Sequence, residues 1–275
     1  MPAISVLLCV HNPDREQLEQ AVDSMIAQTF TDWEMILYDD GSDARSEEMI
    51  RSLADRERRI FYVRGAVHHS LAYGLNVGIG LAGGEYIARM DADDISFPER
   101  LEKEWEFLER HPEYDFVGCN LELMDESGRR WGYRRYPERP EKEDFLEYSP
   151  YPHPAMMFRK KTLTECGAYG EGKKPCRGED YELFIRLHAA GKRGVNLQET
   201  LFSYRESWEG YRRRLFRFQV QEVGIRIRGF RMLGIPCGKN LKYIIKPIIV
   251  WAIPNRLLLF LKRRRTEAQV RRWET

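Results

Sequence analysis

Three carboxylates crowd into four residues of the sequence ARMDADDISFPERL, which spans residues 88–101. Asp91, Asp93 and Asp94 follow an apolar stretch of strand length, so their charges would repel one another at the end of a buried strand. A hard divalent cation such as Mg²⁺ or Mn²⁺ neutralises such a cluster, commonly together with phosphate oxygens of a bound substrate. A diphosphate held by this cation becomes a good leaving group, because the metal neutralises the charge that develops as its bond breaks.

Two other local interpretations of the sequence bear on this cluster. The carboxylates could form a solvated acidic turn before the next helix, whose start is predicted by a capping box at residues 96–99. A calcium loop counted from Asp91 is excluded, because Ile95 and Ser96 stand where a ligand and the turn glycine belong. The sequence GIGLAG at residues 78–83 matches a dinucleotide fingerprint, but it lies after a helix and before a strand, the reverse of the required order. Its glycines therefore indicate close packing of helix on sheet and a helix end.

The elements that must position the carboxylates alternate between strand and helix along the first part of the chain. Apolar runs at residues 4–10, 34–38, 60–63 and 85–90 predict strands, and helices are predicted from Pro13, from Ala44 and over residues 70–82. This alternation predicts a mostly parallel central sheet with helices on both faces, a Rossmann-like α/β fold. Because the carboxyl ends of parallel strands share one edge, we expect Asn12, Asp39 and Asp91 to meet in one crevice.

The pattern changes after the acidic cluster. The sequence predicts two strands around a turn at residues 126–128, a helix at 141–148, a strand at 155–158 and a helix over 179–191, followed by long basic and apolar helices from residue 208.

The 275 residues are 43% hydrophobic, which suffices for the core of one large domain or two small ones. Five cysteines without a C-x-x-C pair argue against a disulfide framework and a zinc site, and they fit a reducing cytoplasm. The N-terminus lacks the basic region of a signal peptide, so we expect it to form the first strand.

The charge is distributed unevenly along the chain. Residues 205–275 contain 18 Lys and Arg against 5 Asp and Glu, while the formal net charge of the whole chain is only +1. Such a basic tail favours an anionic partner surface, and without a nucleic-acid-binding motif we expect membrane rather than nucleic acid. The apolar stretch 244–265 is interrupted by charged residues and two prolines, so we expect an interfacial helix, with Trp251 and the basic cluster 262–265 at anionic headgroups, and not a spanning one. Packing of this helix on the catalytic domain is the alternative.

Six segments of the chain resemble, in order and spacing, family 2 glycosyltransferases of the GT-A fold, and most of all bacterial enzymes of exopolysaccharide assembly. These segments are SVLLCVHN, QTFTDWEMILYDDGSD, LAYGLNVGIGLAGGEYIARMDADDISFPERL, PHPAMMFRKKTL, GEDYELFIRL and FSYR. The resemblance implies a GT-A catalytic domain over residues 1–205, with a nucleotide-binding half (1–95) and an acceptor-binding half (96–205), and a basic amphipathic helical tail (206–275).

The resemblance also implies roles for single residues. Val10, His11, Asn12 and Asp39 would hold the uridine, with Asp39 accepting from the base N–H. Asp91 and Asp93 would be the D-x-D pair, with Asp91 nearer the ribose and diphosphate and Asp93 as main ligand of Mn²⁺ or Mg²⁺. His11 stands where the family more often has tyrosine, and Cys9 where proline or threonine is usual, so contacts to the base could differ.

Asp180 matches the family's catalytic base. Inversion at an anomeric carbon needs one carboxylate opposite the leaving group, within reach of the acceptor hydroxyl proton. Compensation of the helix dipole is the alternative explanation for Glu179 and Asp180 at a helix start. Glu179 is expected to orient or bind acceptor, and Arg177 to clamp phosphate from the loop 170–180. His153 matches a position near the diphosphate or acceptor, with a plain turn histidine between two prolines as the alternative.

The sequence therefore predicts an inverting, metal-dependent transferase. It would move a sugar from a nucleotide diphosphate, a UDP-sugar by preference, to a saccharide or lipid-linked acceptor at the inner face of the cell membrane. A nucleotidyltransferase on a similar sheet is one alternative, although the segment CVHNPDRE lacks the glycine-rich basic loop of those enzymes. A non-catalytic relative that acts as a scaffold is another, and the presence of Asp39, Asp91, Asp93 and Asp180 together argues against it.

Overall fold

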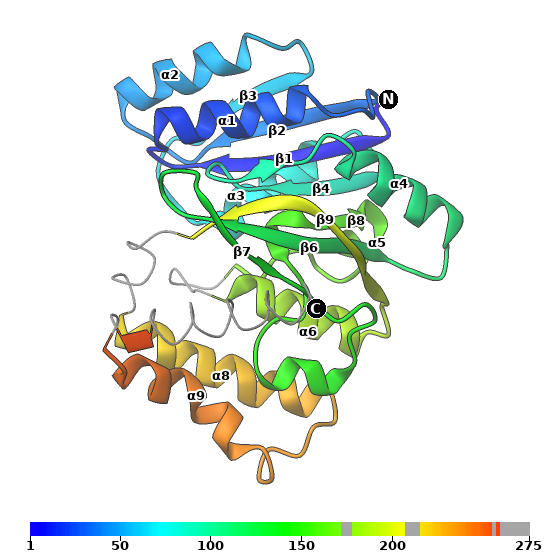
Figure 1. The fold of residues 1–275 in the computed structure, drawn as a ribbon, viewed down its shortest axis with the longest axis vertical. Coiled ribbons are helices and arrows are strands. Elements are labelled where there is room, and N and C mark those ends of the chain that lie inside the picture. Colours follow the sequence, from blue (N-terminus) through cyan, green and yellow to red (C-terminus); the bar gives the residue numbers. More distant parts are fainter. Residues whose placement is uncertain (172–177, 207–214, 255–256, 259–275) are drawn as a thin grey trace.

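One nine-stranded mixed sheet organises the described part of the chain, which comprises residues 1–171, 178–206, 215–254 and 257–258 of this computed structural model (Figure 1). Four parallel strands form its first half in the order β3-β2-β1-β4. Their bounds are β1 Ile4–Val10, β2 Trp33–Asp39, β3 Ile60–Arg64 and β4 Tyr86–Met90. This half confirms the predicted βαβ arrangement.

The second half of the sheet mixes both strand directions. It comprises β5 Ile95–Ser96, β6 Phe116–Met124, β7 Arg130–Arg134, β8 Met157–Arg159 and β9 Gly194–Arg205. Strand β8 runs antiparallel between β4 and β6, β9 pairs in parallel with β6, and β5 pairs antiparallel with β9. The predicted hairpin is present as β6 and β7, and Gly128 in its turn has φ 78°, a conformation that favours glycine.

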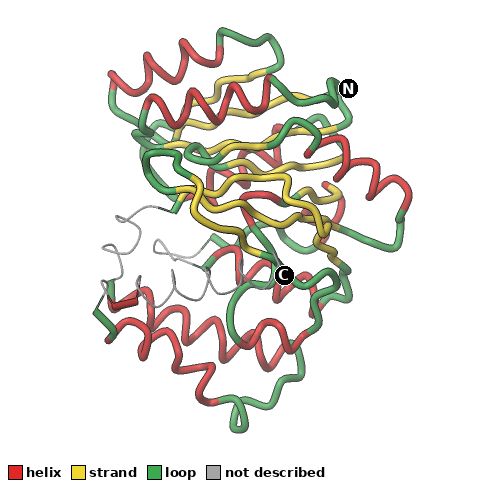
Figure 2. The backbone as a smooth tube through the Cα atoms, viewed as in Figure 1, coloured by secondary structure: helices red, strands yellow, loops and turns green. Residues whose placement is uncertain are grey.

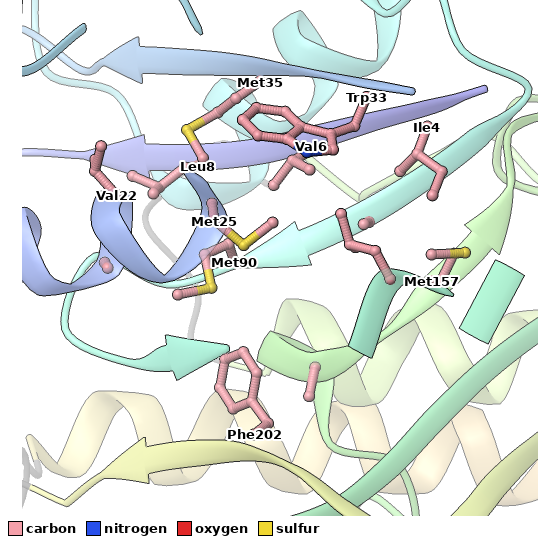
Figure 3. Close-up of a cluster of buried hydrophobic side chains, with 14 of the residues drawn as sticks. Ile4, Val6, Leu8, Val22, Met25, Trp33, Met35, Met90, Met157 and Phe202 are labelled. Atoms are coloured by element: carbon pink, nitrogen blue, oxygen red, sulfur yellow. The ribbon is translucent and has the colours of Figure 1, made fainter. Parts of the chain in front are cut away.

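Helices cover both faces of the sheet, as Figure 2 shows, and confirm the predicted α/β class. One face carries α1 Arg15–Ile26, α2 Ala44–Ala54 and α4 Arg100–Arg110, and the other carries α3 Leu71–Leu81, α5 Lys160–Glu165 and α6 Glu179–Ala189. Alternate residues of β1 serve the two cores. Val6 and Leu8 pack with α1 and β2 in the cluster of Figure 3, whereas Leu7 belongs to the opposite core.

Two local predictions are wrong. The expected capping box is absent: Ser96 lies in β5, its hydroxyl accepts from the Gln28 side chain at 3.2 Å, and α4 begins at Arg100 without a side-chain cap. The helix expected at 141–148 is a short 3-10 helix, η1 Lys142–Leu146. Strand β9 was not predicted, because polar residues interrupt its apolar pattern midway, where the register with β6 also shifts.

The glycines at residues 78–84 serve close packing at one end of α3. A Cβ on Gly78 would lie 2.9 Å from a methyl group of Leu7, and one on Gly84 would lie 2.7 Å from the backbone nitrogen of Ser5. Gly78 therefore allows helix and sheet to approach closely, as predicted, whereas a Cβ on Gly80 would meet nothing within 4 Å. The helix end itself is Ala82, with φ −56°, so no glycine cap terminates α3.

The C-terminal part of the chain begins with a helical hairpin that packs on the α/β body. Helices α8 Phe216–Met232 and α9 Leu241–Ala252 lie beside α6 at the end of the molecule opposite α2 (Figure 1). Phe230 and Ile244 are buried between them. Arg226, 4% exposed, donates to the carbonyl oxygens of Leu146 and Glu147 and so ties α8 to the body. The hairpin is therefore a structural part of the fold.

No helix among the described residues has the length and apolarity that a bilayer span requires. The basic cluster 262–265, on which part of the membrane prediction depends, lies outside the described residues.

Replacing Arg226 with methionine should lower the free energy of unfolding by about 3 kcal/mol, because buried carbonyl oxygens lose their charged donor. Urea denaturation measures this loss. Arg228→Met is the matched control, since Arg228 lies two residues further on the same helix with an exposed side chain, and it should change stability by less than about 0.5 kcal/mol. Equal effects of both substitutions would show that Arg226 does not anchor the hairpin.

Candidate active site

The ends of the first parallel strands meet as predicted. Val10 at the end of β1 pairs with Asp39 at the end of β2, and Leu8 pairs with Met90 at the end of β4. A cavity of about 550 Å³ opens there. Its lining includes five of the six residues predicted for nucleotide and metal: Val10, His11, Asn12, Asp91 and Asp93.

The sixth residue, Asp39, lies behind the cavity wall. Its carboxylate is fully buried and accepts from the backbone nitrogen of Ser42 at 2.9 Å, the Tyr62 hydroxyl at 2.9 Å and the Arg64 guanidinium at 3.1 Å. These bonds hold the turn after β2 in shape. Its role as acceptor for a base N–H remains a prediction.

Asp40 organises the loop wall beside the cavity, although only its neighbour Asp39 was singled out in the sequence. Its carboxylate accepts from the backbone nitrogen of His69 at 3.0 Å and lies 2.9 Å from Nδ1 of His68. The His68 ring in turn stacks on His11 with ring centroids 3.9 Å apart. The loops after β1, β2 and β3 thereby form one connected surface that includes the His11 ring.

Arg89 is the internal counter-charge of the D-x-D segment. The side chain is 2% exposed, and its guanidinium donates to Oδ1 of Asp91 at 2.5 Å and to the carbonyl oxygen of Met90. Asp91 therefore meets a permanent cation on its inner side while it faces the cavity on the other. In the sequence, Arg89 is one residue within a strand, and no pattern marks it as part of the site.

Arg205, at the end of β9, closes the acidic turn from the other side. Its Nε donates to the carbonyl oxygen of Asp93 at 2.7 Å, and its backbone nitrogen donates to Oδ1 of Asp94 at 2.7 Å. The other carboxyl oxygen of Asp94 is buried without a hydrogen-bond partner. Burial, and next the charges of neighbouring aspartates, raises the pKa of Asp93 to about 6 and that of Asp94 well above its usual range.

These carboxylates fit a hard divalent cation. Two of them, Asp91 and Asp93, line the cavity, and burial first, then the charge of Asp91, raises the pKa of Asp93, so a bound cation would stabilise its ionised form. Within the described ranges, no group of three or more His, Cys, Asp or Glu side chains is arranged to hold a metal. The donor set therefore suits a cation that shares its coordination with substrate phosphates and water, as Mg²⁺ and Mn²⁺ commonly do.

Asp180 and His153 line a second cavity of about 440 Å³. Five tyrosines and two arginines are among its described lining residues: Tyr133, Tyr136, Tyr148, Tyr151, Tyr204, Arg134 and Arg135. Asp180 is the second residue of α6, and Gly178 before that helix has φ 106°, which a residue with a side chain rarely adopts. His153 is buried and its Nε2 lies 2.8 Å from the Tyr169 hydroxyl, so it is not a solvated turn residue.

Burial sets the charge states around Asp180. Burial, together with the charge of Asp180, raises the pKa of Glu179 to about 7, and burial raises the pKa of Asp180 as well. Burial first, and then the charge of Arg89, holds the pKa of His153 well below its usual value, so its imidazole is neutral. The charge of Arg89 opposes the rise in the pKa of both Glu179 and Asp180. Arg89 thus acts electrostatically on this second cavity as well as on the cavity lined by Asp91. Arg177 lies outside the described residues.

Residues 5–167, more than half of the chain, match the family described as Glycosyl transferase family 2. The chain belongs to this family. The glycosyltransferase interpretation of the sequence is thereby confirmed, and the family match argues against the nucleotidyltransferase alternative.

Two curated proteins illustrate the relationship. The putative glycosyltransferase EpsE of Bacillus subtilis is 33% identical over 258 residues, which cover 94% of this chain and 92% of that protein. The O-antigen biosynthesis glycosyltransferase WbnJ of Escherichia coli is 29% identical over 206 residues, covering 74% of this chain and 79% of the relative. The first relative extends along nearly the whole chain and thus through the helical tail.

A solved structure shows the same fold. The mannosyltransferase PcManGT from Pyrobaculum calidifontis, in complex with GDP-Man and Mn²⁺, superposes with a TM-score of 0.64 over 95% of this chain and 79% of its own, at 17% identity. The family 2 domain and this neighbour establish the GT-A fold that the sequence predicts.

Replacing Arg89 with methionine should destabilise the fold more at high pH than at low pH. The pKa of Asp93 is about 6 in the folded protein. A carboxyl whose pKa is raised by folding lowers the free energy of unfolding of the protein as the pH rises through that value. Without the guanidinium, the ionised carboxylates should destabilise the fold further. The free energy of unfolding of Arg89→Met should therefore fall increasingly below that of wild type as the pH rises from 4, and the difference should reach about 3 kcal/mol at pH 8.

Urea denaturation across this pH range measures the deficit, and Arg89→Lys, which keeps the charge, should recover most of it. The same deficit at every pH would indicate a packing role without an electrostatic one.

Proposed function

We propose that this glycosyltransferase inverts the anomeric centre of a UDP-sugar with the help of a divalent cation and builds a cell-surface polysaccharide. The observation that carries the proposal is the pair of cavities, one lined by Asp91 and Asp93 and the other by Asp180, with the charge of Arg89 acting on both. One cavity suits a metal-bound diphosphate and the other suits an acceptor beside a base.

On the donor side, the protein binds and orients the nucleotide. Val10, His11 and Asn12 form the wall against which the nucleoside lies, and Asp39 behind them holds the turn that shapes this wall. Asp93 and Asp91 would hold Mn²⁺ or Mg²⁺, which would supply positive charge to neutralise the departing diphosphate. Arg89 limits repulsion between the aspartates while it keeps Asp91 in place.

On the acceptor side, Asp180 takes the proton of the acceptor hydroxyl. The oxygen of that hydroxyl forms a bond to the anomeric carbon as the bond to the diphosphate breaks on the opposite face, and UDP leaves. A pKa raised by burial suits a base that works near neutral pH, and the charge of Arg89 opposes this rise of the Asp180 pKa. Glu179 orients the acceptor, and neutral His153 lines the same cavity with Asp180.

The acceptor is proposed to be a saccharide linked to a lipid. Tyrosine rings, which offer flat apolar faces with a polar tip, dominate the cavity beside Asp180 and suit sugar rings. The relative WbnJ is described as an enzyme of O-antigen biosynthesis, which supports a role in surface polysaccharide assembly. The basic tail supports contact with the inner face of the cell membrane, where a lipid-linked acceptor would be held.

Asp93→Ala should abolish Mn²⁺-dependent binding of UDP, because the diphosphate loses the cation that joins it to the protein. Calorimetry with UDP, in the presence and absence of Mn²⁺, measures the effect. Glu126→Gln removes another charge from the same cavity lining and should leave the affinity within a few-fold of wild type. Unchanged affinity of Asp93→Ala in Mn²⁺ would overturn the metal assignment, and tighter binding of GDP would overturn the choice of UDP.

Asp180→Asn preserves side-chain size and removes basicity, so the rate of sugar transfer should fall by about 10² or more while UDP binding persists. A panel of UDP-sugars with saccharide acceptors identifies the reaction, and proton NMR of the product reports whether the anomeric configuration is inverted. Glu179→Gln is the matched control and should reduce transfer less. The opposite ranking of these two variants would move the base to Glu179.

A further inference from the structure

The outer face of α9 is apolar. Leu241, Ile245 and Ile249 follow one another at intervals of four residues, so they share one face of the helix, and they are 57%, 38% and 51% exposed. We name these three residues the α9 stripe. The opposite face of α9 buries Ile244 and Pro247 against the rest of the protein. A helix whose inner face is already packed therefore presents a second apolar face to the surroundings.

A second exposed apolar site lies where α9 meets α8. Trp251 of α9, 41% exposed, contacts Phe216 of α8, 49% exposed, with ring centroids 4.9 Å apart. Val220, one turn further along α8, is also 48% exposed. Both helices of the hairpin therefore carry exposed apolar side chains. Tryptophan is enriched where proteins meet the headgroup region of a bilayer.

The charge around the α9 stripe favours an anionic bilayer as its partner. Residues 215–254 contain seven Lys and Arg against one acid, Glu222, and α9 itself contains no acid. Lys239 and Lys242 are exposed beside the stripe. Protein interfaces are depleted in lysine, whereas an apolar helix face flanked by lysines is typical of helices that lie in the interface of anionic membranes. Each such lysine adds attraction to anionic headgroups.

The inner side of α9 faces a cavity that reaches the proposed base. This cavity, of about 310 Å³, is lined by Gly178, Asp180 and Tyr181 of the α6 start, by Glu147, Tyr148 and Ser149, and by Gln219, Glu222, Arg226, Lys246, Pro247 and Val250 of the hairpin. Asp180, Tyr148 and Ser149 also line the tyrosine-rich cavity. Asp180 therefore lies where the two cavities meet. One helix, about 10 Å in diameter, separates the α9 stripe from this space.

We propose that the α9 stripe docks the enzyme on an anionic phospholipid bilayer, and that the cavity between α6 and the hairpin receives the acceptor's head group from that bilayer. The proposal rests on the proposed lipid-linked acceptor. It adds the surface that binds the bilayer, the orientation of the enzyme on it and the route by which the acceptor reaches Asp180. The lipid stays in the bilayer beneath α9, and the saccharide extends past the hairpin to Asp180. Donor nucleotide binds in the separate cavity beside Asp91 and Asp93, which the docked bilayer does not touch.

Vesicle binding by the full chain tests the docking surface. Wild type should co-sediment with vesicles of phosphatidylglycerol and phosphatidylcholine, and only weakly with phosphatidylcholine alone. Ile245→Glu with Ile249→Glu should weaken binding at least tenfold and leave UDP affinity in Mn²⁺ unchanged. The matched control is Phe61→Glu with Leu81→Glu, which places two charges on equally exposed apolar residues away from the hairpin and should bind as wild type.

Quenching by brominated phosphatidylglycerol locates the bound surface. Trp251 should be quenched in the docked protein, and the quenched fraction of the fluorescence should fall in Trp251→Phe. If the double glutamate variant binds vesicles like wild type, the α9 stripe is not the docking surface. The same conclusion follows if binding disappears only when Lys262, Arg263, Arg264 and Arg265 are replaced with Gln.

Transfer assays test the route and separate it from the proposed function. With a polyprenyl-diphosphate-linked saccharide in vesicles, the rate of transfer by the double glutamate variant should fall at least tenfold. With the same saccharide without its lipid, the variant should transfer at the wild-type rate.

Val250→Trp narrows the cavity and should slow transfer to the lipid-linked acceptor more than transfer to the free saccharide, with Met232→Trp as exposed control. Equal losses with both acceptors would overturn the route. Transfer that survives Asp93→Ala and Asp180→Asn would instead overturn the proposed function.

Discussion

The requirement to hold several carboxylates close together at one edge of a sheet determines much of this structure. Asp91, Asp93 and Asp94 follow β4, and their charges oppose one another in a partly buried setting. Two guanidinium groups make the arrangement possible. Arg89 meets Asp91 from within the sheet, and Arg205 donates to the backbone of Asp93 from the end of β9. The remaining negative charge faces the cavity, where a cation can bind.

This requirement explains the mixed second half of the sheet. A strand must bring Arg205 to the acidic turn, and β9 does so by pairing with β5, the two-residue strand that follows Asp94. The parallel partner of β9 is β6, so the hairpin of β6 and β7 is fixed to the same frame. Carbonyl oxygens of Asp125 and Glu126 in that hairpin accept from Arg205 as well. One side chain therefore connects the turn after β4 to the hairpin of β6 and β7.

The sequence was sufficient to predict the features that follow from short-range rules. Alternating strands and helices predicted the parallel half, and the strand-end rule placed Val10, His11, Asn12, Asp91 and Asp93 at one cavity. Features that depend on distant partners were missed. Arg89 is indistinguishable from other strand residues until Asp91 folds back on it, and Arg205 meets Asp93 across 112 positions of sequence. The burial of Asp39 beneath Tyr62 and Arg64 is likewise a property of neighbouring strands and not of the motif that contains it.

The hairpin of α8 and α9 belongs to the site for a physical reason. Burial raises the pKa of Asp180, the proposed base near the start of α6, and the charge of Glu222 on α8 raises it further. Glu222 and Arg226 of α8 line a cavity that Asp180 also lines. Arg226 in turn holds the carbonyl oxygens of Leu146 and Glu147, which precede the cavity residues Tyr148 and Ser149. Movement of the hairpin would therefore change both the access of an acceptor to Asp180 and the basicity of Asp180. In this architecture the environment of the proposed base and the proposed docking surface are built from the same two helices, so docking on a bilayer would be physically coupled to reactivity toward acceptors.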